Sequence, residues 1–363
     1  MAGTAATAVL PILLPKNCFC TDKPMANERV IVVGAGSISN AWFGPIQKEE
    51  LTVAAVVDLR IDAAQAQIDK YKLSDAIASN DLGKTLHEIK ADFVIDLTIP
   101  QAHCEVTCKA LAAGLHVIGE KPMAASMDEA RRMIAASDKS GKLYMVSQSR
   151  RWDSKHATIA KALGDGAAGK VTALNCDFFL GAHFGGFREE MPSPLILDMS
   201  IHHFDLARMF SRQSAVSVYA EEFNPAGSWY KGDVAANCLF EMAGHVRFAY
   251  RGSWCAEGFP TSWNGDWRII GEKGTLLYAA DKDPSGEVVS GDEGFMRSRS
   301  LMPIAQVEIS KTGMHGALDE MLRFLRTGSV PQTDCHDNIH SLAMVLGAIE
   351  SSKAGKRIQI GDL

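Results

Sequence analysis

Short runs of apolar, β-branched residues alternate with helical stretches between residues 29 and 147, and this alternation limits the possible folds most strongly. The runs are apolar along their whole length, as in strands that are buried on both faces of a parallel sheet. Right-handed crossovers between such strands produce a doubly wound sheet. The runs read RVIVVGAG, LTVAAVVD, ADFVIDLTIP, LHVIGEKP and KLYMVSQS. We therefore predict an N-terminal, doubly wound α/β domain over residues 29–147.

The pattern changes after residue 148, where strand-like runs follow one another without a helix between each pair. They read KVTALNCDFFL, AVSVYAEE, AANCLFEM, HVRFAYRGSW and TLLYAA, and turn signals separate several of them. Such spacing indicates antiparallel pairing. Two helical stretches, 315–327 and 336–353, precede a final RIQI. We predict an α+β domain over residues 148–363, built on a large, mostly antiparallel open sheet.

Composition excludes several classes of protein. The chain has 363 residues and a formal net charge of −6, and its 37 Lys and Arg residues form no basic stripe for nucleic acid or anionic lipid. No apolar run approaches the ~18 residues that would span a membrane. The eight cysteines form no CxxC pair and no metal-ligand spacing, which indicates reduced thiols, a cytoplasmic location and no metal site.

Residues 1–28 are expected to form a disordered extension ahead of the folded domain. The stretch AATAVLPILLP is similar to a short secretory signal, but no basic residues precede it, and Pro11 and Pro15 interrupt it. A signal peptide is therefore the weaker alternative. We expect a chain that starts at Met25 to retain full activity.

The segment VVGAGSIS occupies the strand-to-helix turn where a dinucleotide fingerprint belongs. Gly34 allows the tight turn, and Gly36 lets the backbone approach a pyrophosphate at the helix N-terminus. Ser39 stands where the third glycine is usual. Asp58 ends the second strand, where a carboxylate accepts the ribose hydroxyls and repels a 2′-phosphate. The pattern predicts a Rossmann-type site that prefers NAD to NADP, although Arg60 moderates the repulsion; a glycine turn without a ligand is the alternative.

Lys121, in the sequence GEKP, follows the fifth apolar run. The carboxyl ends of the strands form the edge where open α/β sheets bind ligands, so we expect Lys121 to face the nicotinamide end of a cleft. There it would hydrogen-bond a substrate hydroxyl and stabilise the alkoxide that develops. The same edge carries Thr98 and Pro100, which would line the cofactor. His103 is predicted to line it as well, with a structural role as the alternative.

The sequence LILDMSIHHFDLARMF supplies the partners of that lysine. In an α-helix that begins near Asp198, the side chains of Asp198, His202 and Asp205 share one face. A carboxylate beside an imidazole fixes its tautomer and raises its basicity, as a general base requires. One alternative is an N-cap with a buried histidine. A metal site is a poorer alternative, because the adjacent residues His202 and His203 point in divergent directions on a helix.

These motifs together resemble the Gfo/Idh/MocA oxidoreductase family over nearly the whole chain from residue 29. GAGSIS, TIP with a later histidine, EKP, RRWD and LDMSIHHFD occur in the family's order. The resemblance implies that Lys121, Asp198 and His202 are catalytic, and that the protein is a homodimer or homotetramer. It also places Arg151 and Trp152 near the substrate, with a linker salt bridge and packing as the alternative. The expected cofactor-binding residues are Gly34, Gly36, Ser37, Ile38, Asp58, Arg60, Thr98, Pro100, His103, Glu120 and Lys121.

We therefore predict an NAD-dependent dehydrogenase that oxidises a secondary hydroxyl of a sugar, glycoside or inositol. His202 would remove the hydroxyl proton, Lys121 would hold the oxygen, and Asp198 would orient the pair. The aromatic segment 181–187 and the three tryptophans of residues 254–267 are candidates for the wall that faces the sugar. Two alternatives are an enzyme that uses tightly held NAD for transient oxidation in elimination or glycoside cleavage, and a non-catalytic sensor or scaffold. Ser200 departs from the glycine that is usual in the family.

Overall fold

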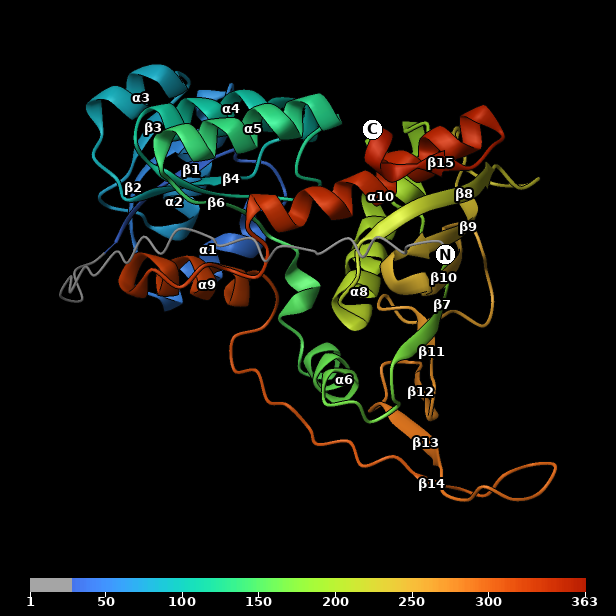
Figure 1. Cartoon of the computed structure of the whole chain (residues 1–363). Helices are drawn as coiled ribbons and strands as arrows, with labels where there is room; N and C mark the ends of the chain where they lie inside the picture. The colour runs from blue at the N-terminus through green and yellow to red at the C-terminus, as the bar shows by residue number, and fades with distance from the viewer. Residues whose placement is uncertain (1–27) are drawn as a thin grey trace, which may run out of the picture.

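A computed structural model describes residues 28–363. The predicted N-terminal extension lies outside the described residues, apart from residue 28. Two sheets, each with its own layer of helices, lie side by side in Figure 1. Helices α9 and α10, near the end of the chain, return toward the N-terminal sheet (Figure 1). None of the helices between residues 28 and 363 is both long and apolar enough to cross a bilayer.

The N-terminal sheet is six-stranded and wholly parallel, with the order β3-β2-β1-β4-β5-β6. This order confirms the predicted doubly wound fold, and it changes direction between β1 and β4. Its strands are β1 (Arg29–Val33), β2 (Thr52–Val57), β3 (Ile77–Ser79), β4 (Phe93–Asp96), β5 (His116–Gly119) and β6 (Tyr144–Val146). Its helices are α1 (Ser39–Lys48), α2 (Ile61–Tyr71), α3 (Leu82–Glu88), α4 (Pro100–Ala112) and α5 (Met127–Ser140).

Local sequence signals explain where these elements begin and end. Every residue of β4 is buried, as expected of a strand covered on both faces. The Ser126 hydroxyl accepts a hydrogen bond from the backbone N–H of Glu129 and so caps α5, which ends at Gly141 in the left-handed region. The edge strand β3 was not predicted, because three residues carry too little periodicity to reveal a strand.

The second sheet has nine strands in the order β14-β13-β12-β11-β7-β10-β9-β8-β15. All neighbouring pairs are antiparallel except β7 and β10, which confirms the mostly antiparallel prediction. Its strands are β7 (Val171–Phe179), β8 (Ala215–Phe223), β9 (Ala235–Met242), β10 (Arg247–Ser253), β11 (Asp266–Gly271), β12 (Gly274–Tyr278), β13 (Ser285–Val289), β14 (Arg299–Leu301) and β15 (Ile358–Gln359). Its helical segments are α6 (Ser154–Gly164), α7 (Phe187–Glu190), a π-helical segment (Leu195–Ser200), α8 (Ile201–Ser211) and α10 (Cys335–Ala354).

The two sheets share helices from the end of the chain. Helix α9 (Gly313–Thr327) packs on α1, and its Met321 and Leu322 join the same buried cluster as Trp42 and Phe43. Helix α10 begins against β6 and α5, and it also packs on β8 of the second sheet. The division at residue 147 stays a prediction, and residues well beyond it help to bury the N-terminal sheet.

Candidate active site

The glycine turn after β1 has the geometry of a phosphate cradle. Gly34 has a φ of +99°, and a Cβ there would lie 2.7 Å from the carbonyl carbon of Leu97, so only glycine fits. A Cβ on Gly36 would meet no atom within 4 Å, which leaves open space beside the turn. Ser39 is fully buried, and its Oγ donates to the Gly36 carbonyl at 2.7 Å. The serine in the third glycine position therefore closes the turn with a hydrogen bond.

The carboxylate of Asp58 lies against this turn. Its Oδ2 accepts a hydrogen bond from the Ala35 backbone N–H at 2.8 Å, and its Oδ1 accepts one from the Arg60 N–H at 2.9 Å. Both oxygens keep further lone pairs, because a carboxylate accepts about four hydrogen bonds. The Arg60 side chain is 71% exposed, with its Nε 3.9 Å from Asp58 Oδ1. The residues fit the adenosine ribose of a dinucleotide, and Arg60 extends toward solvent at its rim.

The segment that follows β4 combines buried polar side chains with an exposed apolar one. Thr98 Oγ1 donates to Asp96 Oδ1 at 2.6 Å, and His103 Nδ1 lies 3.1 Å from Asp96 Oδ2. The His103 ring is 1% exposed, so it supports Thr98 from below and does not form the ligand-facing surface, in agreement with the structural alternative. Ile99 is 64% exposed above this layer and, with the exposed Leu59 after β2, offers apolar surface for a planar base.

Lys121 reaches into the space between the two sheets and not into bulk solvent. Its Nζ donates to the backbone carbonyl of Asp198 at 2.8 Å and to the Asp198 Oδ1 at 2.7 Å, and only 17% of its side chain is exposed. The Lys121–Pro122 peptide bond is cis. Glu120 lies beneath it, where its Oε1 accepts from Trp42 Nε1 and burial raises the pKa of its carboxyl. Glu120 therefore supports the strand end, and the Lys121 ammonium is held by Asp198.

Asp198 belongs to a π-helical segment, which corrects the single-face helix predicted from the sequence. The wider π-helical turn changes the register before α8 begins at Ile201, so Asp198 is not one α-helical turn before His202. The Nδ1 of His202 is buried without a hydrogen-bond partner among residues 28–363. Asp205 points elsewhere and accepts two hydrogen bonds from Arg151, each of 2.7 Å. The predicted carboxylate–imidazole hydrogen bond is absent from this part of the chain.

The serine at position 200 contributes to this segment. Its Oγ donates to the Leu195 carbonyl at 3.1 Å and contacts the hydroxyl of Tyr250 at 3.0 Å. Both contacts are buried, and they join the π-helical turn to β10. A glycine would make neither hydrogen bond, so Ser200 gives this chain an additional attachment directly beside the candidate site.

Arg188 is a site residue that the sequence did not reveal. Its Nε donates to Asp198 Oδ2 at 2.6 Å, so Asp198 receives one cation on each oxygen. Its guanidinium also lies over the rings of Phe184 and Phe187. Burial raises the pKa of Asp198, but Lys121 and Arg188 outweigh it and hold the pKa below its usual range. The only available signal was an arginine directly after the aromatic segment 181–187.

His202 carries a neutral imidazole, the form that can accept a proton. Burial lowers the pKa of His202 well below its ordinary value, and the positive charges of Arg150 and Lys121 and the neighbouring His203 lower it further. The imidazole is therefore neutral at pH 7. His202 as a whole is half-buried, and its Nδ1 is buried without a hydrogen-bond partner among the described residues.

Arg151 and Trp152, which were predicted to lie near the substrate, are both buried and have partners within the protein. Arg151 is 6% exposed and pairs with Asp205 and Asp337. Trp152 is 5% exposed, and the Cα of Gly316 packs so closely on it that a Cβ there would lie 2.4 Å from the Trp152 Cβ. These contacts are those of the alternative, a linker salt bridge with packing, and a role near the substrate stays a prediction. The preceding residue, Arg150, faces the site instead.

Aromatic side chains form one side of the cleft, although fewer than predicted. Trp254 and Trp267 are each 2% exposed and belong to the core of the second domain. Trp263 is 46% exposed and Phe184 is 39% exposed, with ring centroids 6.2 Å apart. These two rings are the candidates for the wall that faces a sugar.

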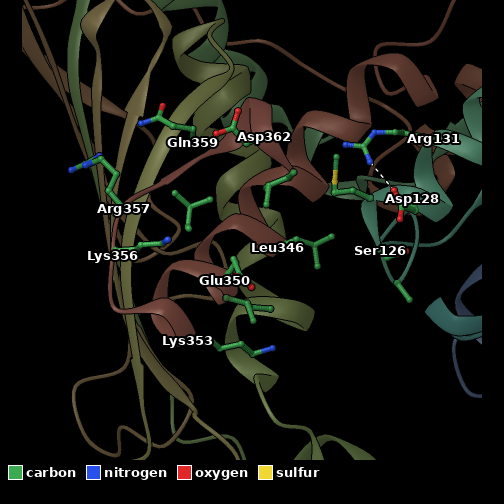
Figure 2. A pocket seen from close by; sticks show the side chains of 15 residues that line it. Ser126, Asp128, Arg131, Leu346, Glu350, Lys353, Lys356, Arg357, Gln359 and Asp362 are labelled. Carbon is green, nitrogen blue, oxygen red and sulfur yellow. Dashed lines mark hydrogen bonds and ion pairs between the residues drawn. The ribbon is translucent and has the colours of Figure 1, made fainter.

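One cavity among the described residues lies away from this chemistry. It has a volume of about 630 Å³ and is bordered by α5, the second half of α10 and the C-terminal residues (Figure 2). Among the side chains drawn there, the only marked interaction is that between Arg131 and Asp128 (Figure 2). Neither Lys121 nor His202 lines it, so the candidate active site is defined by its side chains and not by cavity size.

The fold, the glycine turn and the acidic residue after β2 define an NAD-binding oxidoreductase of two domains. The chain belongs to the GFO/IDH/MocA family. Residues 28–148 match the model of the oxidoreductase family with an NAD-binding Rossmann fold, and residues 156–277 match the GFO/IDH/MocA C-terminal domain. Its named relatives are dehydrogenases and reductases of sugars and polyols.

Two relatives and one solved structure illustrate the similarity. The chain is 27% identical over 297 residues to D-apiose dehydrogenase of Paraburkholderia graminis, covering 78% of this chain and 76% of that protein. It is 22% identical over 342 residues to 1,5-anhydro-D-fructose reductase of Ensifer adhaerens, covering 91% and 97%. An oxidoreductase from Agrobacterium radiobacter, solved in complex with NAD+, L-tartaric acid and magnesium, has a TM-score of 0.81 at 19% identity, covering 93% and 99%. That last similarity is one of fold.

Proposed function

We propose that this protein is an NAD-dependent dehydrogenase that oxidises a secondary hydroxyl of a sugar, glycoside or inositol. One observation carries the proposal: Lys121, at the ligand-binding edge of the Rossmann sheet, is bound by Asp198 of the second domain. This contact joins the two domains, and the charge of Lys121 also acts on the neutral His202. The family's named relatives act on hydroxyl groups of this kind.

Each residue has a distinct role in this mechanism. The Lys121 ammonium donates a hydrogen bond to the substrate oxygen and stabilises the negative charge that develops there. The neutral His202 accepts the hydroxyl proton. Asp198 stays ionised and holds the ammonium in position by charge and hydrogen bonding. Bound NAD+ supplies the acceptor for the hydride that leaves the same carbon.

The proposed cofactor preference rests on Asp58. Its carboxylate lies at the turn where the adenosine ribose would sit, and an ionised carboxylate repels a 2′-phosphate. Arg60 is largely in solvent and 3.9 Å from that carboxylate, so it offsets only part of this repulsion. We therefore favour NAD over NADP.

A substrate panel tests the function directly. Aldoses, inositols and glycosides would each be mixed with NAD+ or NADP+, and absorbance at 340 nm would report net reduction. Oxidation of at least one compound with NAD+ is the expected result. Product formation without net NADH would instead favour transient oxidation by tightly held NAD. Cofactor binding without any turnover across the panel would favour a sensor or scaffold.

The outer face of the second sheet supports the proposed homodimer or homotetramer. Helices α8 and α10 cover one face, whereas Tyr219 and Leu239 are paired across β8 and β9 and are 43% and 53% exposed. Other exposed apolar side chains on the sheet are Val216, Phe223 and Leu277. A second copy would cover this surface. Light scattering would give the mass in solution, and a monomer at micromolar concentration would contradict the proposal.

A cytoplasmic location also remains a proposal. The six cysteines among residues 28–363 are free thiols, and four of them are buried. Burial raises the pKa of Cys335 to about 12, so this thiol stays protonated. Such thiols suit a reducing compartment. Fractionation of the producing cells would test this location.

A further inference from the structure

Arg150 is a partly buried cation that lacks a carboxylate partner. It lies in the short 3-10 helix Ser149–Arg151, just after β6, and its Nη1 donates to the side-chain oxygen of Asn264. Within residues 28–363, no carboxylate oxygen lies at ion-pair distance from it. Burial lowers the pKa of Arg150 to about 10, so the side chain still carries its charge at pH 7.

Two other buried arginines of the same region, unlike Arg150, form ion pairs with carboxylates. Arg151 is bound by Asp205 and Asp337, and Arg208 is bound by Asp337. Buried cations are usually paired in this way, because an unpaired charge loses its hydration without compensation. Asn264 offers Arg150 only a neutral amide oxygen, and the guanidinium has five N–H donors. Arg150 therefore has no ion-pair partner among the described residues, and several of its N–H donors are free to bind a ligand.

Arg150 lies beside the candidate active site. After burial, its positive charge is the largest influence that lowers the pKa of both His202 and His203. Its partner Asn264 follows Trp263, the exposed aromatic residue whose carbonyl oxygen lies 3.3 Å from His203 Nε2. The guanidinium thus belongs to the part of the cleft that holds the imidazoles and the aromatic wall.

Three cations lie around the candidate site, and only two of them pair with its central carboxylate among the described residues. The cations are Lys121, Arg150 and Arg188, and the ionised carboxylate that binds two of them is Asp198. Burial raises the pKa of the nearby Glu120 carboxyl. The carboxylates whose charge acts on Arg150 are Asp281, which accepts a hydrogen bond from the Asn264 amide nitrogen, and Asp153, and neither forms an ion pair with the guanidinium among residues 28–363.

We propose that Arg150 binds a carboxylate of the substrate, so that the preferred substrate is an acidic sugar or acidic polyol, such as a uronate or an aldonate. This inference rests on the proposed dehydrogenase function and specifies its substrate class. The planar guanidinium matches a carboxylate with two parallel hydrogen bonds. One free cation suits a single negative charge. A phosphate ester would require a second cation, and both Lys121 and Arg188 are already bound to Asp198.

Matched pairs of compounds test the substrate class. The pairs are D-glucuronate with D-glucose, D-galacturonate with D-galactose, and D-gluconate with D-glucitol, each with NAD+ at constant ionic strength. We expect at least one acid to exceed its neutral partner in kcat/KM by about 10- to 100-fold, as one charged hydrogen-bonded contact allows. D-Glucose 6-phosphate is included to test whether the enzyme prefers a phosphate ester. Equal or better use of the neutral compounds, or a preference for the phosphate, would overturn the proposal.

The variant Arg150→Gln tests the residue. Its ratio of acid to neutral kcat/KM should fall to near 1, while Arg131→Gln, the same change on the exposed face of α5, should keep the wild-type ratio. NADH affinity, measured by fluorescence, and the melting temperature report whether each variant is folded. An unchanged ratio in a folded Arg150→Gln protein would contradict the assignment.

A binding measurement separates this inference from the proposed function. Calorimetry with NADH present would compare D-glucuronate and D-glucose on the wild type and on Arg150→Gln. If no compound of the panel is oxidised, the dehydrogenase proposal fails. Binding of the acid that is at least 10-fold tighter than that of glucose, and that is lost in Arg150→Gln, would still support an anion site. Equal binding of the two sugars would refute it.

Discussion

Lys121 Nζ and Asp198 Oδ1 lie 2.7 Å apart, although 77 positions separate the two residues in the chain. The same ammonium donates to the Asp198 carbonyl, and the second carboxylate oxygen binds Arg188. One carboxylate therefore organises two cations, one from each side of the cleft. The position of the lysine depends on both domains.

Replacement of Lys121 by alanine should lower kcat by about 100-fold or more, because acid–base and oxyanion-stabilising groups contribute that much. The affinity for NAD should remain close to that of the wild type. Steady-state kinetics and a fluorescence titration with NADH would measure the two effects. Unchanged turnover in a folded Lys121→Ala protein would remove the lysine from the mechanism.

The two glycines of the cofactor turn should respond differently to alanine. Gly34→Ala should destabilise the domain, because its Cβ would overlap the Leu97 backbone and its φ of +99° disfavours a side chain. Gly36→Ala should leave the melting temperature unchanged, since its Cβ meets no protein atom, and should weaken NAD binding. Thermal unfolding with and without NADH would distinguish them. Equal loss of stability in both variants would contradict the cradle.

Asp58→Ala should weaken NAD binding by about 10- to 100-fold, because charged hydrogen bonds to the ribose are lost. NADP binding should weaken less, since the variant also loses a repulsive charge. Asp58→Asn serves as a control that retains one acceptor for the Ala35 N–H. An unchanged ratio of the two dissociation constants would show that the ribose lies elsewhere.

Arg151→Gln should reduce the free energy of unfolding by about 3 kcal/mol, because the buried Asp205 loses its two-bonded partner and keeps only Arg208 at 3.6 Å and the Ser341 hydroxyl. Its effect should be on stability and not on substrate preference. Lys161→Gln provides a control, since its ion pair with Asp165 is exposed and contributes about 0.5 kcal/mol at most. Urea unfolding would measure both. A small loss in Arg151→Gln would mean that the linker contributes little to stability.

The pH dependence of kcat/KM should show its acidic limb well below pH 6.5. Burial, Arg150 and Lys121 lower the pKa of His202, so the imidazole loses its proton-accepting form only at more acidic pH. Arg150→Gln removes one of these causes and should move the limb upward, toward 6.5. A pH–rate profile with an acidic limb above 6.5 in the wild type would exclude His202 as the base.

The sequence predicted those site residues whose position follows directly from strand order. Gly34, Asp58 and Lys121 each follow a parallel strand, and the carboxyl ends of such strands meet at one edge. Asp198 was also placed correctly near Lys121. Its partner on the other oxygen, Arg188, comes from a short loop helix whose position depends on tertiary packing.

The failures concern side chains whose direction depends on local geometry. The π-helical segment changed the register between Asp198 and Asp205, and no spacing rule for α-helices reveals such a turn. Two adjacent arginines, Arg150 and Arg151, point to different environments, and the sequence did not indicate which one reaches the cleft. Their burial and partners separate them only in three dimensions.

Because α9 docks on α1, the N-terminal domain cannot be separated from the end of the chain without exposing apolar side chains. Met321 and Leu322 complete the hydrophobic layer under Trp42, so a fragment that ended near residue 147 would expose that layer to water. Such a fragment should aggregate or require detergent, even though it contains every strand of its sheet. Helices α9 and α10 therefore connect the cofactor-binding sheet to the second sheet, and the N-terminal sheet depends on them to bury part of its core.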